Sequence, residues 1–242
     1  MKDESGPYFV SVVADSHVGF VRAHNEDAWR LDAQGGWIVV ADGMGGHAGG
    51  EIASRIGVDA VDAALRHDMV RDTVDAVVAA NAAVVEASDG ALQGMGATLV
   101  VACLARGLLE IAWVGDSRAY LLRAGRLQQL SHDHTRAQEL VDAGVLDAAS
   151  AADHPQRHVL TRSIGTAGLG REHVGTVTRP VANGDRILLC SDGLHGEIGD
   201  RAIEACLVGR RRDADAAQAL IDAALAAGAH DNVTVAVATV AV

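Results

Sequence analysis

Apolar residues recur along this chain with two different periods, and each period predicts one kind of element. Apolar positions three or four residues apart favour helices, whereas short continuous or alternating apolar runs favour strands. Helical spacing predicts helices at 50–66, 70–87, 135–144, about 200–209 and 213–227. Strand-like runs occupy 8–15, 37–42, 173–181, 185–192 and 232–242. We expect the polar segment 16–32 to be a strand that turns into a loop.

The stretch from 97 to 131 has a different character from the rest of the chain. Short apolar runs follow one another there, separated by RG, GDS and AGR. Turn residues at such short intervals are typical of antiparallel strands joined by hairpins, so we predict a meander. Helix pairs that alternate with hairpin-linked strands indicate antiparallel sheets covered by helices. The expected class is α+β, not a parallel doubly wound sheet.

A polar region follows the short helix predicted at 135–144, which Gly144 closes. Its apolar residues follow no clear period, and we expect residues 135–162 to form a surface flap. Two arginines of this flap, Arg157 and Arg162, are candidates for contacts with acidic or phosphorylated peptides. Exposed arginines are most often simply solvated, which is the alternative for both.

The composition favours one globular domain over the whole chain, residues 1–242. Apolar residues make up 49% of the 242 residues, which is enough for a sizeable core. Aromatic residues make up only 3%, so Val, Leu, Ile and Ala must fill that core. We find no linker rich in Pro or Ser, no charge block and no internal repeat that would divide the sequence.

Charge and cysteine usage narrow the choice of partners and compartment. The net charge of −12 argues against nucleic acid or an anionic membrane surface as a partner. The longest apolar stretches have about the length of a strand, so membrane insertion is not expected. The N-terminal MKDESGPYFV lacks the pattern of a signal peptide, and three widely spaced cysteines form no CxxC pair. We therefore expect a cytoplasmic protein.

Three of the apolar runs end on a carboxylate. Asp42 and Asp192 are each followed by Gly, and Asp116 ends the run EIAWVGD. Asp-Gly is a common hairpin turn, and that explanation is sufficient for any single site. It is weaker for the two Asp-Gly sites together, because one leads into a predicted helix and the other into a polar segment.

A fourth acid, Asp231, stands just before the last predicted strand. In an antiparallel sheet the start of one strand lies beside the end of its neighbour. One sheet edge would therefore collect Asp42, Asp192 and Asp231, with Asp116 nearby. Clustered carboxylates repel one another and need cations between them. Oxygen ligands without Cys or dedicated His favour Mg²⁺ or Mn²⁺ over zinc, so we predict a divalent-metal site.

Eight blocks occur in order across nearly the whole chain. They are RAHNEDAW (22–29), VVADGMGGHAGGEIAS (39–54), MGATLV (95–100), WVGDSRAY (113–120), LSHDHTRAQELVDAG (130–144), HPQRHVLTRSIG (154–165), LLCSDGL (188–194) and HDNVTV (230–235). Each block alone is a weak signal, but the ordered set closely resembles the metal-dependent serine/threonine protein phosphatases of the PPM (type 2C) family in their compact bacterial form.

The resemblance implies a fold and a set of metal ligands. The fold would be a four-layer αββα sandwich, in which two antiparallel β-sheets are flanked by helix pairs. Asp42 would bridge two Mn²⁺ or Mg²⁺ ions, and the Gly43 carbonyl would bind one of them. Asp192 and Asp231 would hold the other ion.

The same resemblance assigns roles to residues around the ions. Asp27, together with Glu26, would position metal-bound waters. Asp116 would join Asp192 at a third, looser metal position seen in bacterial relatives. Arg22 would grip the substrate phosphate.

Two histidines are weaker candidates. His47 would protonate the departing serine or threonine oxygen, since His suits proton transfer near neutral pH. Animal-type relatives carry a His directly after Asp-Gly, where this chain has Met44, so a loop histidine without a catalytic role is the alternative. His195, which follows SDGL, would tune the cleft.

The resemblance also implies a mechanism and partners. A hydroxide shared by two metals would attack the phosphorus in line, without a phosphoenzyme intermediate. The substrates would be phosphorylated proteins, including the targets of a Ser/Thr kinase and the kinase itself. We expect the protein to act as a monomer.

Three other functions fit parts of the sequence. GMGGHA after a strand fits a dinucleotide-binding fingerprint, but Asp42 would then face the pyrophosphate. CLVGRRR (206–212) has the Cys-x5-Arg spacing of thiol-dependent phosphatases, but Ala205 and Asp213 stand where those enzymes usually have His and Ser or Thr. A phosphoprotein-binding module that has lost catalysis would be expected to lack some of the metal acids.

Overall fold

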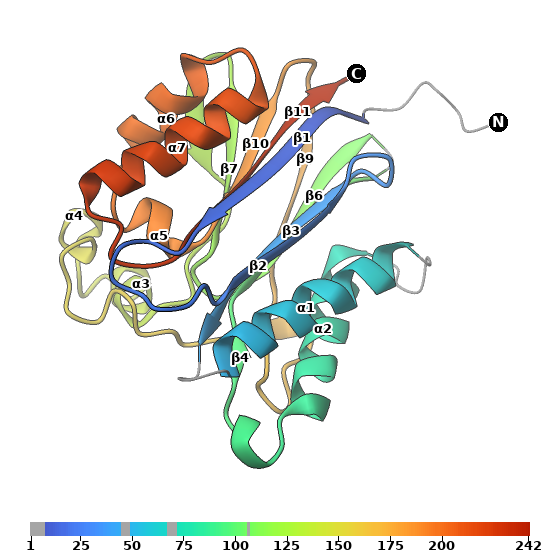
Figure 1. The fold of residues 1–242 in the computed structure, drawn as a ribbon, viewed down its shortest axis with the longest axis vertical. Helices are drawn as coiled ribbons and strands as arrows, with labels where there is room; N and C mark the ends of the chain where they lie inside the picture. The colour runs from blue at the N-terminus through green and yellow to red at the C-terminus, as the bar shows by residue number, and fades with distance from the viewer. Residues whose placement is uncertain (1–7, 45–48, 67–71, 106) are drawn as a thin grey trace.

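A computed structural model describes residues 8–44, 49–66, 72–105 and 107–242, and it places two antiparallel sheets face to face with helices on both outer faces (Figure 1). Three apolar layers separate the four layers of secondary structure: one between the sheets and one under each helix layer. The α+β class and the αββα order are therefore confirmed.

Both sheets are antiparallel throughout. The first has the order β1-β11-β10-β7-β8, with β1 (Tyr8–His17), β11 (Val233–Ala241), β10 (Arg186–Cys190), β7 (Arg118–Arg123) and β8 (Arg126–Gln129). The second has the order β2-β3-β5-β6-β9, with β2 (Asp27–Asp32), β3 (Trp37–Met44), β5 (Leu99–Ala105), β6 (Leu108–Val114) and β9 (Gly175–Pro180). The short β4 (Gly96–Ala97) pairs with β3.

The long helices cover the outer faces of the sheets. α1 (Gly49–Arg66) and α2 (Thr73–Ala87) pack on the second sheet, whereas α6 (Asp200–Val208) and α7 (Asp213–Ala227) pack on the first. Strand β3 is apolar on both sides because both of its faces are buried, and successive side chains point to opposite faces. Val39 and Ala41 contact the helix layer, and Ile38 and Val40 contact the other sheet.

The meander predicted at 97–131 is wrong in one respect. β5 and β6 form a hairpin in the second sheet, but β7 and β8 belong to the first. The GDS segment is therefore a crossing between the two sheets. Gly115 has a φ of +103° there, and a Cβ at this position would meet Thr98 at 2.6 Å, so this bend requires glycine. The crossing leaves Asp116 between the sheets.

The loops near this crossing gather at one end of the sandwich. The flap contains α3 (Arg136–Asp142) and α4 (Ala148–Ala151), and the short α5 (Asp192–His195) follows β10. In Figure 1 these three helices lie at the end away from the C-terminus. The segment 16–32 begins with the last two residues of β1, as predicted, and then runs as a loop into β2, a second strand that was not expected there. Two single-turn helices, η1 (Gly90–Leu92) and η2 (Arg171–His173), complete the described elements.

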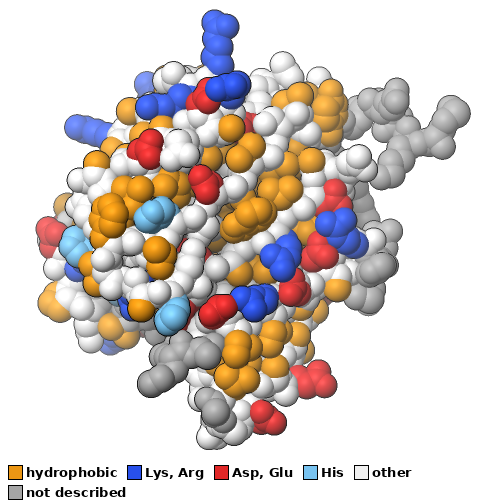
Figure 2. Space-filling model, viewed as in Figure 1, with side chains coloured by type: hydrophobic (Ala, Val, Ile, Leu, Met, Phe, Trp, Pro, Cys, Tyr) orange, Lys and Arg blue, Asp and Glu red, His pale blue; other side chains and the backbone are white. Residues whose placement is uncertain are grey.

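Charged side chains of both signs are mixed on the face shown in Figure 2. Helix α1 is tied to the second sheet by exposed ion pairs, Arg30 with Asp59 and Arg66 with Asp32. Exposed pairs of this kind contribute about 0–1 kcal/mol each, so they add little to stability. None of the described helices has both the length and the apolar character needed to cross a membrane.

Candidate active site

The acids predicted to bind metal meet at one end of the sandwich, and they come from both sheets. Asp42 lies in β3 and pairs directly with Asp27 on β2. Asp192 is the first residue of α5, and Asp231 lies just before β11. Asp116 lies at the crossing. The sequence pattern predicted one sheet edge; the structure instead brings the acids together between two sheets.

Four of these acids line one cavity of about 690 Å³ together with Arg22: Asp42, Asp116, Asp192 and Asp231. Residues 158 and 160–162 of the predicted flap, and residues 163 and 166–169 beyond it, also line this cavity. A cavity of this size, with a few convergent polar groups among apolar ones, is typical of a ligand site.

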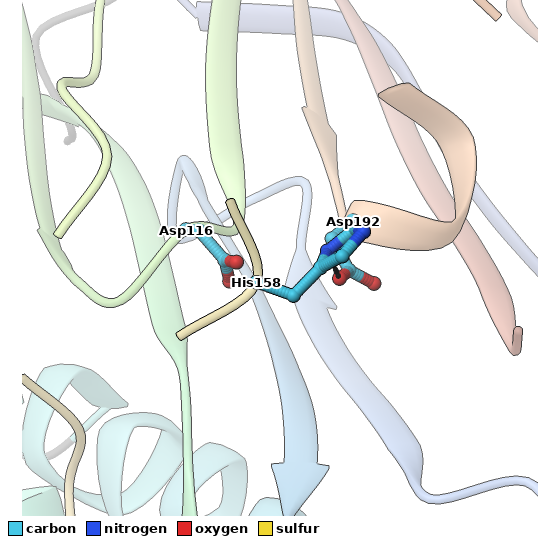
Figure 3. A group of neighbouring side chains, drawn as sticks. All are labelled: Asp116, His158 and Asp192. Carbon is cyan, nitrogen blue, oxygen red and sulfur yellow. Dashed lines mark ion pairs between the residues drawn. The ribbon is translucent and has the colours of Figure 1, made fainter. Parts of the chain in front are cut away.

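The tightest group in the site joins two of the acids to a histidine of the flap. Ligand atoms of Asp116, His158 and Asp192 all lie within 4.8 Å of one another (Figure 3). His158 Nδ1 is 3.3 Å from Asp192 Oδ2. His158 was not predicted as a site residue, because a histidine in a polar surface segment follows no pattern that would distinguish it.

Asp27 belongs to the second sheet, but its carboxylate is hydrogen-bonded by a residue that directly follows β10 of the first sheet. Ser191 donates its hydroxyl to Asp27 Oδ2 at 2.7 Å, while Oδ1 is buried without a hydrogen-bond partner among the described residues. Such an acceptor is costly unless a water or a cation satisfies it. Burial, assisted by the charges of Asp192 and Asp231, raises the pKa of Asp27 to about 7. This environment fits a site built for a cation and its waters.

The remaining buried acids repel one another. Burial raises the pKa of Asp42 and of Asp116 well above the usual range, and the charge of Asp192 adds to both shifts. Burial also acts to raise the pKa of Asp192, but contacts with His158 and Asp42 lower it below its usual value overall. Without a cation the cluster therefore retains protons, which divalent ions would displace.

These pKa shifts predict how the stability of the chelated protein depends on pH. The pKa of Asp27, Asp42 and Asp116 is higher in the folded protein than in the unfolded chain, and that of Asp27 is about 7, so the folded protein binds more protons than the unfolded chain does as the pH rises through neutrality. The free energy of unfolding should therefore fall as the pH rises. Burial lowers the pKa of His134 and His195 to about 4, so both rings are largely neutral in either state over this range.

Thermal melts in EDTA should thus show a Tm that decreases from pH 7 to pH 8. Saturating Mn²⁺ should reverse the decrease, because metal binding releases these protons. Asp42→Asn should flatten the dependence in EDTA. A Tm that rises over this range without metal would contradict the assigned proton uptake.

Arg22 lines the cavity beside one of the predicted ligands. Its Nη2 donates to Asp231 Oδ2 at 2.6 Å, and 56% of its side chain is exposed. The hydrogen bond with Asp231 raises the already high pKa of the guanidinium. Arg22 therefore presents a fixed positive charge to a ligand in the cavity.

Glu26 and Gly43 lie at the junction of β2, β3 and α1. The Gly43 N–H donates to the Glu26 carbonyl at 3.1 Å. A Cβ at Gly43 would collide with the carbonyl of Gly50, so the close approach of these segments requires glycine. Burial raises the pKa of Glu26 above its usual value. The predicted proton donor, His47, lies outside the described residues.

Asn232 positions the loops of the site, and it was not among the site residues predicted from the sequence. Its buried side chain accepts a hydrogen bond from the Glu26 N–H at 2.8 Å. Its amide donates to the carbonyls of Val18 at 2.8 Å and His24 at 2.9 Å. The loop before β2 is thereby tied to the start of β11. The sequence feature that could have identified Asn232 is a polar amide at the start of an otherwise apolar strand.

The structure also bears on the alternatives. Antiparallel sheets exclude the dinucleotide-binding fold suggested by GMGGHA. Cys206 lies in α6, where its Sγ is 3.6 Å from the Ala219 carbonyl and burial raises its pKa, the opposite of what a nucleophilic thiol needs. His195 lies beside the site, with Nε2 3.0 Å from the Asp116 carbonyl.

The family model for protein phosphatase 2C matches residues 19–223. The serine/threonine protein phosphatase PstP of Mycobacterium tuberculosis is 41% identical over 239 residues, which cover 94% of this chain and 44% of PstP. This chain thus spans less than half the length of that relative. The serine/threonine phosphatase stp of Listeria welshimeri is 34% identical over 230 residues, 90% of each chain.

Solved structures agree with the family match. The crystal structure of PstP/Ppp from Mycobacterium tuberculosis has a TM-score of 0.87 at 38% identity and covers 95% of this chain and 97% of that one. The PstP catalytic domain in complex with two manganese ions has a TM-score of 0.84 at 36% identity, over 98% and 100% of the two chains. These matches confirm the resemblance seen in the motifs: the chain belongs to the protein phosphatase 2C family.

Proposed function

We propose that this protein hydrolyses phosphoserine and phosphothreonine in proteins and requires two divalent cations, Mn²⁺ or Mg²⁺, to do so. The observation that carries the proposal is the convergence of buried and half-buried acids from both sheets, together with an arginine, on one cavity. Membership of the family and the two manganese ions bound by PstP support it.

Four residues would hold the cations: Asp42, Asp192 and Asp231 through their carboxylates, and Gly43 through its carbonyl. The chemistry that such cations would supply is a lower pKa for bound water, from about 15.7 toward about 7, and compensation of the charge on a phosphate. A third cation would bind more loosely beside Asp116.

The chain's own groups would bind and orient the phosphate and the attacking water. The Arg22 guanidinium offers parallel donors that match two phosphoryl oxygens, and its hydrogen bond to Asp231 directs it into the cavity. Asp27, with one oxygen held by Ser191, keeps its other oxygen free to accept a hydrogen bond from a water. Glu26 would assist in ordering these waters, and His47 would protonate the departing oxygen.

The cavity suits a protein substrate because the flap forms part of its lining. The substrates would be proteins phosphorylated by a Ser/Thr kinase, and the kinase itself would be among them. The three cysteines are unpaired, which supports a reducing compartment such as the cytoplasm. We propose that the protein acts there as a monomer.

Removal of metal tests the reaction class. EDTA should reduce hydrolysis of a phosphothreonine peptide and of p-nitrophenyl phosphate to background, because the nucleophile depends on bound cations. Added Mn²⁺ should restore turnover. Iodoacetamide should leave turnover intact, because no cysteine lines the cavity among the described residues.

Two outcomes would contradict the proposal. Turnover that resists EDTA but is lost on alkylation would favour a thiol mechanism. Binding of the phosphothreonine peptide without turnover at any Mn²⁺ concentration would identify a phosphoprotein-binding module instead.

A further inference from the structure

The segment CLVGRRR, which the proposed active site does not use, forms the end of α6 and the turn into α7. Helix α6 ends at Val208 and α7 begins at Asp213, so three consecutive arginines, residues 210–212, occupy the turn. All three are exposed. Adjacent like charges repel one another, so this run does not serve the stability of the turn itself.

A buried arginine holds this turn in one conformation. Arg186 is only 8% exposed. Its guanidinium donates to the carbonyls of Leu207 at 2.6 Å, Arg210 at 2.9 Å and Arg211 at 3.0 Å, and its Nε lies 2.9 Å from Oδ1 of the buried Asp213. A buried charge is tolerated when it is both paired and hydrogen-bonded. Because the backbone of the turn is fixed in this way, a ligand that binds there has little chain to order.

The strand order brings further arginines to the same end of the molecule. Strand β10 begins at Arg186, and its neighbour β7 ends at Arg123, which lies directly across the hairpin from Arg126. Arg123 also donates to the carbonyl of Pro180, the residue after Arg179, at 2.8 Å. We call the six exposed arginines at this end of the first sheet the basic end: Arg123, Arg126, Arg179, Arg210, Arg211 and Arg212.

The basic end carries more positive charge than its neighbouring acids balance. Arg123 pairs with Asp185, and Arg212 pairs with Asp215. The other four arginines form no ion pair within the described part of the chain, and one carboxylate among them, Glu204, accepts a hydrogen bond from the backbone of β8. Figure 2 shows blue side chains gathered at the top of the molecule, where Figure 1 places the turn between α6 and α7. This end is therefore a local exception in a chain of net charge −12.

The charge of the whole chain limits which anion the basic end can bind. Salt screens exposed charges beyond about 8–10 Å, so a short anionic segment at the basic end interacts with its arginines and little with the rest of the surface. An anionic membrane or a nucleic acid is longer than this end and would also face the acidic remainder of the protein. The charge distribution thus favours a short acidic stretch of polypeptide.

We propose that the basic end is a docking surface for an acidic segment of the phosphoprotein substrates, separate from the segment that carries the phosphate. The inference rests on the proposed function and deepens it, because it names a second feature of the substrate. Strand β10 runs from Arg186 to the residues before Asp192, so the basic end and the cavity are about 20 Å apart at about 3.3 Å per residue. At least about six extended residues must therefore separate the acidic segment from the phosphothreonine.

Two phosphothreonine peptides test this inference. They share the sequence around the phosphate and a neutral linker, and they end either in a run of glutamates or in an equal run of glutamines. With saturating Mn²⁺ at low salt, the wild-type protein should hydrolyse the glutamate peptide with a KM about tenfold lower, at a similar kcat, because several exposed charge contacts form when the peptide binds at both places. Raising the salt concentration to about 0.5 M should remove most of this difference.

A double variant and a matched control identify the surface. Arg210→Ala with Arg211→Ala should remove most of the preference for the glutamate peptide and leave turnover of the glutamine peptide and of p-nitrophenyl phosphate unchanged. The carbonyls that Arg186 holds persist in this variant, so its Tm should equal that of the wild type. Arg30→Ala with Arg201→Ala removes the same charge from exposed positions outside the basic end and should keep the preference.

The outcomes separate this inference from the proposed function. Equal KM values for the two peptides in the wild type, or the same loss of preference in both double variants, would overturn the docking surface and leave the phosphatase proposal standing. A lower Tm with loss of all turnover in the variant at 210 and 211 would assign the turn a structural role, which also overturns the inference.

The same variants exclude other anions. Binding to phosphatidylglycerol vesicles or to a labelled DNA oligonucleotide that depends on Arg210 and Arg211, and that is tighter than binding to the glutamate peptide, would assign the basic end to a membrane or a nucleic acid instead. If the wild-type protein hydrolyses neither peptide at any Mn²⁺ concentration, the proposed function itself is wrong.

Discussion

Replacing Asp192 with Asn is expected to reduce Mn²⁺-dependent turnover by about 10³-fold, the upper range for losing one preorganised electrostatic contact. Asp192 contacts both Asp42 and His158, so its charge serves two proposed metal positions. The same substitution should make the Tm in EDTA less dependent on pH between pH 7 and pH 8, because the charge of Asp192 raises the pKa of Asp42 and Asp116.

The prediction is therefore tested by two measurements on the same variant. Turnover of p-nitrophenyl phosphate is followed with excess Mn²⁺, and Tm is followed in EDTA, where each 1 kcal/mol corresponds to about 2–4 °C for a chain of this size. Asp222→Asn is the matched control, because Asp222 is an exposed aspartate of α7 that bonds only Gln218 among the described residues. A variant that is still active and keeps the wild-type pH dependence of Tm in EDTA would refute both the site and its electrostatics.

Replacing Arg22 with Ala should lower kcat by about 10²–10³-fold, the usual cost of removing one donor that stabilises developing charge. Stability should change by less than about 1 kcal/mol, because the ion pair with Asp231 is exposed. Arg22→Lys should recover only part of the loss, because lysine keeps the charge but lacks the planar pair of donors.

Steady-state kinetics on a phosphothreonine peptide tests this role. The matched control is Arg30→Ala, since Arg30 forms a comparably exposed pair with Asp59 at 2.7 Å and does not line the cavity. Equal kinetics in Arg22→Ala and the wild type would remove Arg22 from the phosphate site. A large loss of stability would instead assign it a structural role.

Most of the elements could be predicted because their apolar patterns are strong. Strand β3 is apolar on both faces, and α1 keeps helical spacing over its whole length, so both were expected close to their observed bounds. The run of β6, β7 and β8 was harder. A glycine-containing turn has the same sequence pattern whether it closes a hairpin or carries the chain to another sheet, and only the packing of Gly115 against Thr98 separates the two.

The acids of the site were predictable for the same reason, since a carboxylate at the end of an apolar run is conspicuous. The place where these acids come together could not be predicted, because the pairing of strands within a sheet does not specify how two sheets stack. His158 and Asn232 were missed because their environment is tertiary. One lies in an irregular flap, and the other acts through hydrogen bonds to loops distant in sequence.

Because the acids come from two separate sheets, the distances between them depend on how the two sheets pack against each other. Asp42 is carried by one sheet and Asp192 follows a strand of the other, so their separation is set by the side chains sandwiched between them, such as Ile38, Val100 and Leu189. The dimensions of the proposed metal site are thus set by the thickness of the apolar layer between the sheets, and a shift of one sheet relative to the other would change the distances between its acids.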